Sequence, residues 1–218
     1  MTEPEIIDTQ EFPEISATEG SSSASETEKQ IIIVNNLNPS LDGKASRSVG
    51  LIGDISEQKS EEVIGTLIHL SDQCDPDAEV IRPIDMYIST YGGSVVDMFA
   101  MYDLMRVIKQ KCTVSTIGLG KVMSAGVLLL ANGTKGERKV GKNCRIMLHN
   151  VMAGFGGTLI NVENEVKEVK WIQQRYIDCL EMQTNLTKKK IQKMLNKQLD
   201  VYISAEQAIE YGIADVII

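Results

Sequence analysis

Apolar and polar positions along the chain follow two alternating patterns, one typical of strands and one typical of helices. Buried strands are expected at residues 48–53, 84–89, 112–117 and 144–148. Helices are expected at residues 57–71, 94–109, 124–131, 161–186 and 188–198. A short strand at 201–203, a helix opened by the capping box at 204–207, and a closing strand at 213–218 complete the pattern. Strands that alternate with helices are typical of parallel βαβ units, so the predicted fold class is α/β.

The start of the chain differs in composition from the rest. Residues 1–28 contain eight acids, no lysine and no arginine, and they include a serine-rich run at 20–25. This composition predicts a disordered acidic tail over residues 1–29, followed by a single domain over residues 30–218. The remainder contains as many acids as bases, so the net charge of −8 comes from the tail. Without a basic excess, nucleic-acid binding is not expected.

Two further observations narrow the class of protein. No apolar stretch reaches the roughly 18 residues of a membrane span, so no membrane partner is expected. The four cysteines lie far apart and form no Cys-x-x-Cys pair; they are Cys74, Cys112, Cys144 and Cys179. This spacing predicts neither a zinc site nor a disulfide framework, and it fits a reducing cytosol. We therefore expect no metal, no cofactor and a cytoplasmic location.

A serine stands where a strand-like run turns into a short apolar helix. Ser124 follows the glycine-containing turn at 118–123 and precedes the apolar run at 125–131. A hydroxyl at the start of a buried helix lies beside free backbone N–H groups, which suits a nucleophile. The competing interpretation is that Ser124 only caps the helix.

Two more features are expected at the same edge of the sheet, because sites in parallel sheets gather at the carboxyl ends of strands. His149 follows the strand at 144–148, and the pair Gly92–Gly93 follows the strand at 84–89. The other histidine, His69, lies inside a predicted helix and is expected to be a surface or packing residue. His149 is therefore the natural general base for Ser124.

Several motifs occur in an order that is similar to that of one known family. They are the segments 88–93, 102–103, 115–124, 133–138, 145–149 and 200–215. Together they resemble the proteolytic subunit of the Clp protease (ClpP, peptidase family S14) over residues 49–215. The resemblance implies a ClpP/crotonase-like fold of ββα units with a projecting handle helix. It also implies a serine endopeptidase that hydrolyses peptides and unfolded proteins.

The resemblance assigns a role to each residue that matches a family motif. Ser124 matches the nucleophile, His149 the general base, and Asp200 the acid that orients the histidine. The backbone N–H groups of Gly93 and Ala125 match the oxyanion hole. These assignments would complete the four parts that acyl transfer needs: nucleophile, base, orienting group and oxyanion donors.

The resemblance also implies how substrate is bound and how subunits assemble. The segment Gly154-Phe155-Gly156-Gly157 resembles the strand that lines the substrate groove, where glycines let a peptide backbone approach closely. The family forms a heptameric ring or two stacked rings with the sites inside, and it works with an AAA+ Clp unfoldase. A helix of about 25 residues spans about 38 Å. We therefore expect the helix at 161–186 to project and to pack against another subunit.

Three other functions are compatible with parts of the pattern. A signal-peptide-peptidase-like enzyme would use a Ser–Lys dyad, with Lys121 or Lys142 as the base. A non-catalytic ClpP-like ring subunit would keep the scaffold without the activity. A crotonase-type acyl-CoA enzyme would use the same glycine-rich oxyanion geometry without the Ser–His–Asp set. The chain also departs from the family at Leu199, where an arginine that contributes to ring-to-ring contacts usually precedes the acid.

Overall fold

The computed structural model describes residues 46–74, 82–196 and 199–218. The predicted acidic tail at 1–29 and the start of the predicted domain at 30 lie outside these residues, as does the end of the helix predicted at 188–198. The helices and strands of the described residues follow in this order: β1 (Ser48–Ile52), α1 (Glu57–Asp72), β2 (Ile84–Thr90), α2 (Val95–Ile108), β3 (Val114–Met123), α3 (Ala125–Ala131), β4 (Arg138–Val140), β5 (Arg145–Leu148), α4 (Leu159–Gln183), α5 (Lys188–Leu195), β6 (Val201–Ile203), α6 (Ala205–Glu210) and β7 (Val216–Ile217).

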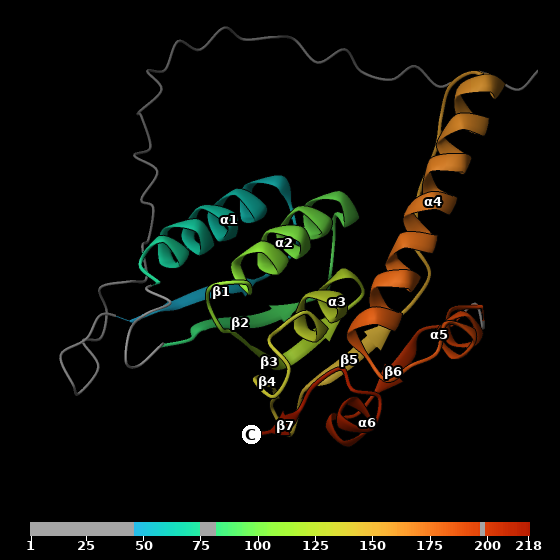
Figure 1. Ribbon diagram of the computed structural model, residues 1–218. Helices are drawn as coiled ribbons and strands as arrows, with labels where there is room; N and C mark the ends of the chain where they lie inside the picture. Colours follow the sequence, from blue (N-terminus) through green and yellow to red (C-terminus); the bar gives the residue numbers. More distant parts are fainter. Residues whose placement is uncertain (1–45, 75–81, 197–198) are drawn as a thin grey trace, which may run out of the picture. The chain divides into compact units, whose positions relative to one another are not determined.

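The strands form one sheet in which almost every pair is parallel. The order β1-β2-β3-β4-β7 is parallel throughout, and β6 pairs antiparallel with β5. The long strand β3 divides the sheet, because its residues 116–118 pair with β4 and its residues 121–123 pair with β5 (Figure 1). The α/β class predicted from the alternation of strands and helices is confirmed.

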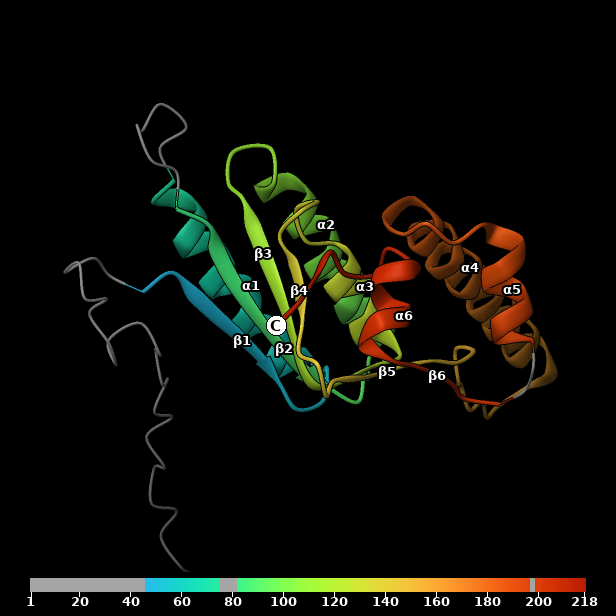
Figure 2. The same cartoon turned by 90° about the horizontal axis from the view of Figure 1, so that it is seen from below.

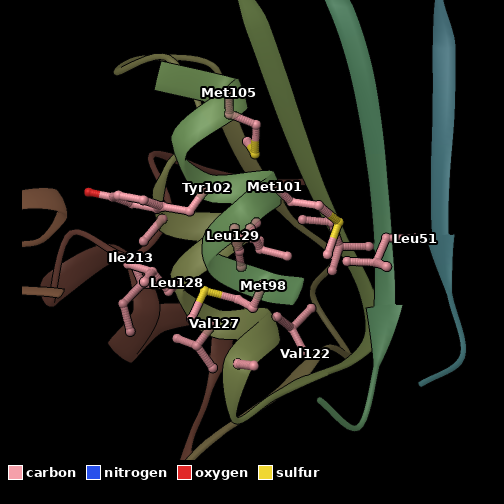
Figure 3. Close-up of a cluster of buried hydrophobic side chains, with 14 of the residues drawn as sticks. Leu51, Met98, Met101, Tyr102, Met105, Val122, Val127, Leu128, Leu129 and Ile213 are labelled. Atoms are coloured by element: carbon pink, nitrogen blue, oxygen red, sulfur yellow. The ribbon is translucent and has the colours of Figure 1, made fainter. Parts of the chain in front are cut away.

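Helices cover one face of the sheet and create the core. α1 packs on β1 and β2 and against α2, while α3 packs against α2 and β3 (Figures 1 and 2). Every residue of α3 is buried. Met101 of α2 points toward the strands, whereas Met98 points toward α3 (Figure 3). The labelled core side chains are Leu51, Met98, Met101, Tyr102, Met105, Val122, Val127, Leu128, Leu129 and Ile213, and all are 1% exposed or less.

The predicted long helix exists, although its bounds differ by two or three residues from those expected. α4 has 25 residues, and its buried ones all lie near its C-terminal end, from Tyr176 to Leu180. Its N-terminal part extends beyond the sheet (Figure 1), and Leu159 and Ile160 there are more than 70% exposed. α5 packs against α4 (Figure 2). α4 therefore joins the core at one end and offers an uncovered surface at the other.

One strand is longer than the sequence predicts. The expected strand at 112–117 begins at Val114 and continues to Met123, through the residues that were expected to form a turn. Gly120 has φ of 64° and bends the strand without ending it. The extension matters because it places the last residues of β3 beside β5, directly before Ser124.

The expectation that the cysteines form no disulfide is wrong for one pair. Cys74, just after α1, and Cys112, just before β3, form a disulfide with their Cα atoms 6.1 Å apart. The cysteines are 38 positions apart in the sequence, which hid this proximity, because the intervening segment with β2 and α2 returns the chain to the end of α1. Cys144 and Cys179 are free and buried. Within the described ranges no helix combines the length and apolarity of a membrane span.

The disulfide is tested by counting thiols. Protein denatured without reductant is expected to react with iodoacetamide at Cys144 and Cys179 only, and at all four cysteines after reduction. Peptide mass mapping measures both states. Alkylation of Cys74 and Cys112 in protein that has never met a reductant, and was purified under air, would contradict the pairing.

Candidate active site

Ser124 directly precedes α3, at the position where the other helices of the described chain have a side chain that caps the helix. The residues before α1, α2, α4, α5 and α6 are all Ser or Thr, and each side chain accepts a hydrogen bond from a backbone N–H of its helix. Ser124 precedes α3 and makes no such bond. Its hydroxyl is instead bonded to His149. The interpretation of Ser124 as a simple helix cap is therefore wrong.

The backbone of Ser124 is strained. It has φ of 53° and ψ of −124°, and it is the single non-glycine residue with positive φ in the described ranges. Such a conformation costs about 1–3 kcal/mol and persists only where the surroundings impose it. Gly92 is part of those surroundings, since a Cβ on it would lie 2.7 Å from Cβ of Ser124 and 3.0 Å from the carbonyl oxygen of Met123. The turn thus holds the side chain out toward β5 and needs a glycine opposite.

His149 reaches Ser124 because β3 and β5 run parallel in a fixed register. Met123 lies opposite Met147, and the N–H of Ser124 donates to the carbonyl oxygen of Met147 at 2.8 Å. Two residues later, Nε2 of His149 lies 2.7 Å from Oγ of Ser124. If the serine hydroxyl donates this bond, the neutral imidazole carries its proton on Nδ1. The geometry suits transfer of the hydroxyl proton to Nε2.

Two hydrogen bonds hold the residues that follow His149. The side-chain amide of Asn150 donates to the carbonyl oxygen of Leu195 at 2.9 Å. The N–H of Val151 donates to Oε1 of Gln173, on α4, at 2.7 Å. His149 therefore belongs to a segment that is hydrogen-bonded to α4 and α5 and that follows directly from the sheet.

Asp200 lies on the other side of the imidazole. Its Oδ1 is 3.7 Å from Nδ1 of His149, which is within ion-pair range but longer than a hydrogen bond. Its side chain is 48% exposed, whereas that of His149 is 18% exposed. The structure thus brings Ser124 and His149 into direct contact and places Asp200 beside them without closing the second bond.

Gly93 follows Gly92, which packs against Ser124, and Ala125 directly follows Ser124 in the chain. The loop that contains Gly93 is fixed to Ile55 by two bonds, from Ile55 N–H to the Gly92 oxygen at 2.8 Å and from Ser94 N–H to the Ile55 oxygen at 2.9 Å. Gly93 lies between these bonded residues and its N–H takes part in neither bond. Ala125 is the first residue of α3, so its N–H has no partner within the helix.

The segment Gly154-Phe155-Gly156-Gly157 lies between His149 and α4 and forms neither strand nor helix. All four residues are exposed. A Cβ at Gly154 or Gly156 would meet nothing within 4 Å, so both positions are open to an approaching chain. Gly157 has φ of 123°, which restricts that position to glycine.

Comparisons with known proteins give the family of the chain. A family model described as Clp protease matches residues 38–218. The ATP-dependent Clp protease proteolytic subunit of Deinococcus radiodurans is 36% identical over 164 residues, which cover 75% of this chain and 76% of that protein. The chain belongs to the Clp protease family.

Membership of the Clp protease family makes the chain a serine endopeptidase. It also accounts for the mostly parallel sheet with helices, which is consistent with the fold of that family. Among the described residues no group of three or more His, Cys, Asp or Glu is placed to hold a metal ion. The Ser–Lys alternative gains no support at Lys121, because its ammonium group lies over the ring of Tyr91, 4.4 Å from the ring centroid.

The sequence pattern missed two polar residues of α4 that support the site. In the sequence Tyr176 is one of the mostly aliphatic positions that recur every three or four residues along the predicted long helix, and Gln173 stands out by no pattern. In the structure the Tyr176 hydroxyl donates to the carbonyl oxygen of Ser124 at 2.8 Å, and Gln173 holds Val151 as described above. The available signal was a hydroxyl-bearing residue among aliphatic positions. This pattern indicates that the tyrosine is buried, but it does not indicate which group its hydroxyl bonds.

Gly93→Ala tests the close packing behind the nucleophile. An added Cβ would overlap the carbonyl oxygen of Ile55 and lie 2.8 Å from its nitrogen, so the loop has to shift relative to Ser124. We expect kcat for a short fluorogenic peptide to fall about 100-fold, as when one oxyanion donor is lost. The matched control is Gly136→Ala, at φ of 89° with nothing within 4 Å, which strains the backbone elsewhere. Equal kcat values for the two variants, with folding checked by circular dichroism, would contradict this account.

Proposed function

We propose that the chain hydrolyses peptide bonds through a Ser124–His149–Asp200 triad. Oγ of Ser124 attacks the carbonyl carbon of the scissile bond while Nε2 of His149 takes its proton. His149 then gives this proton to the leaving amine, which departs and leaves an acyl ester on Ser124. A water molecule, deprotonated by His149, attacks the ester, the bond from the acyl carbon to Oγ breaks, and His149 returns the proton to Oγ as the acid product leaves. The 2.7 Å bond between a non-capping serine and the imidazole carries the proposal.

Asp200 has the role of orienting His149 and of stabilising the imidazolium that forms in each step. The 3.7 Å separation supports this role, since a shift of about 1 Å would bring the pair to a hydrogen-bond distance. The N–H groups of Gly93 and Ala125 bind the oxyanion of the tetrahedral intermediate. Their support is that Gly93 follows Gly92, which packs against Ser124, that Ala125 directly follows Ser124, and that neither N–H takes part in the bonding of the Gly92 loop.

The substrates are peptides and unfolded proteins, bound in an extended form along Gly154, Phe155, Gly156 and Gly157. The openness of this segment supports the proposal, because a peptide backbone can approach glycine more closely than any other residue. An extended peptide offers its own N–H and C=O groups to such a strand-like edge. The activity would then depend little on the substrate's side chains near this segment.

The active form is an oligomer, in which a heptameric ring or a double ring encloses the sites. The exposed apolar residues of α4, including Leu159, Ile160 and Trp171, support a surface that another subunit covers. The Deinococcus radiodurans relative is the proteolytic subunit of an ATP-dependent protease, which supports an AAA+ Clp unfoldase as a partner. We place the protein in the cytoplasm.

A non-catalytic ring subunit is the outcome that would overturn the proposed triad. One observation favours it: the second bond of the triad is open, and Asp200 is half exposed. In such a subunit the scaffold and the serine would remain, but Asp200 would not stabilise the imidazolium that forms when His149 takes the serine proton.

Loss of labelling in point variants tests the proposed chemistry. Wild-type protein is expected to react with a fluorophosphonate probe and to cleave a short fluorogenic peptide, while Ser124→Ala does neither. His149→Ala is expected to lower kcat at least 1,000-fold, because no other group takes the serine proton. The matched control, His69→Ala, removes an exposed imidazole on α1 and is expected to keep wild-type kcat.

The outcomes separate the candidate functions. Peptide cleavage by Ser124→Ala at the wild-type rate would exclude this serine as nucleophile. Activity retained by His149→Ala but lost in Lys121→Ala or Lys142→Ala would identify a Ser–Lys enzyme. Wild-type protein that assembles, as judged by native mass spectrometry, but never labels would be the non-catalytic subunit.

A further inference from the structure

The backbone carbonyl oxygen of Ser124 accepts a hydrogen bond from the side chain of a residue on a distant helix. Oη of Tyr176 lies 2.8 Å from the carbonyl oxygen of Ser124, and that oxygen already accepts a bond from the N–H of Val127 at 3.0 Å. Satisfying a buried carbonyl requires only one donor. The tyrosine bond is therefore an addition to the ordinary bonding of a helix start, and it comes from a helix 52 residues further along the chain.

The bond acts on the peptide unit that joins Ser124 to Ala125. In a planar trans peptide the C=O and the following N–H point in opposite directions. A group that fixes the direction of the Ser124 carbonyl therefore also fixes the direction of the Ala125 N–H. That N–H is one of the two donors assigned above to the oxyanion. The same bond restrains the strained dihedral angles of Ser124, which set the direction of its Oγ.

Tyr176 is itself held firmly. It is 4% exposed and belongs to the C-terminal part of α4, where Ile177, Cys179 and Leu180 are also buried. Burial raises the pKa of the Tyr176 phenol well above its ordinary value, so the hydroxyl keeps its proton and remains a donor at any pH at which a histidine base works. The donor is thus rigid and permanently available.

From these contacts we propose that Tyr176 is a positioning residue for the hydrolysis. Its hydroxyl holds the Ser124–Ala125 peptide so that Oγ of Ser124 faces His149 and the Ala125 N–H faces the developing oxyanion. The proposal rests on the proposed triad and oxyanion hole, and it adds a residue of α4 that does not touch substrate. It also makes α4, whose other end is uncovered in the single chain, a direct support of the catalytic turn.

If Tyr176 only stabilised the fold, a different experimental result would be expected. In that case Tyr176→Phe, which keeps the ring and removes only the hydroxyl, would lower thermal stability and leave the turnover of folded protein unchanged. A positioning residue would instead lower kcat and the rate of fluorophosphonate labelling together. KM would stay constant, since Tyr176 does not contact the peptide.

The matched control is Tyr102→Phe. Tyr102 is also a buried tyrosine, 1% exposed, and its hydroxyl accepts a bond from Nε2 of Gln183 at 3.0 Å (Figure 3). Burial raises the pKa of its phenol as well. Removing this hydroxyl disturbs the core to a similar extent without touching the Ser124 turn.

We expect Tyr176→Phe to lower kcat and the labelling rate about tenfold, which corresponds to about 1.4 kcal/mol in the activation free energy. KM is expected to remain within about twofold, and Tyr102→Phe is expected to keep wild-type kcat. Folded Tyr176→Phe with wild-type kcat, or an equal loss in both variants, would overturn the proposal. Neither result would affect the proposed function, which is tested separately by labelling of the wild-type, Ser124→Ala and His149→Ala proteins.

A second measurement applies if Tyr176→Phe is not recovered folded. Wild-type protein carrying 3-fluorotyrosine at position 176 alone is compared by fluorine NMR before and after fluorophosphonate labelling. The resonance is expected to shift on labelling, because its hydrogen-bond acceptor belongs to the modified residue, while 3-fluorotyrosine at position 102 is expected to give an unchanged signal. An unchanged signal at position 176 would overturn the proposal.

Discussion

The parallel pairing of β3 with β5 is the constraint on which the site depends. It sets Met123 opposite Met147 and lets the N–H of Ser124 bond to the Met147 oxygen, so that His149 arrives beside the serine. Side chains alternate between the faces of a sheet, and a slip of one residue would turn the imidazole to the other face. The distance between the nucleophile and its base is therefore a consequence of strand register.

The strained Ser124 turn is the second part of the same arrangement. Its positive φ prevents the hydroxyl from capping α3 and leaves it free for His149. The strain is tolerated because every side of the turn is occupied: Gly92 packs against the side chain, Met147 accepts from the N–H, and Tyr176 donates to the carbonyl. The sheet, the Gly92 loop and the long helix thus all contact Ser124. Together these contacts maintain a strained backbone conformation that Ser124 would not adopt by itself.

Much of this could be predicted from the sequence, and the reasons for the exceptions are physical. The alternation of strands and helices predicted the fold class. The rule that sites gather at the carboxyl ends of parallel strands predicted that Ser124 and His149 lie close together, as they do in the structure. The extension of β3 to Met123 was missed because its glycines resemble a turn until the pairing with β5 is known. The Cys74–Cys112 disulfide and the bond from Tyr176 join segments 38 and 52 residues apart, and no local pattern encodes such contacts.

The central claim is that Ser124 attacks a carbonyl carbon while Gly93 and Ala125 bind the resulting oxyanion. The structure of the assembled protein after reaction with a peptidyl phosphonate tests it most directly. The account predicts phosphorus bonded to Oγ of Ser124, with one phosphonyl oxygen within about 2.7–3.1 Å of both N–H groups. Phosphorus on another side chain, or a phosphonyl oxygen turned away from both N–H groups, would contradict it.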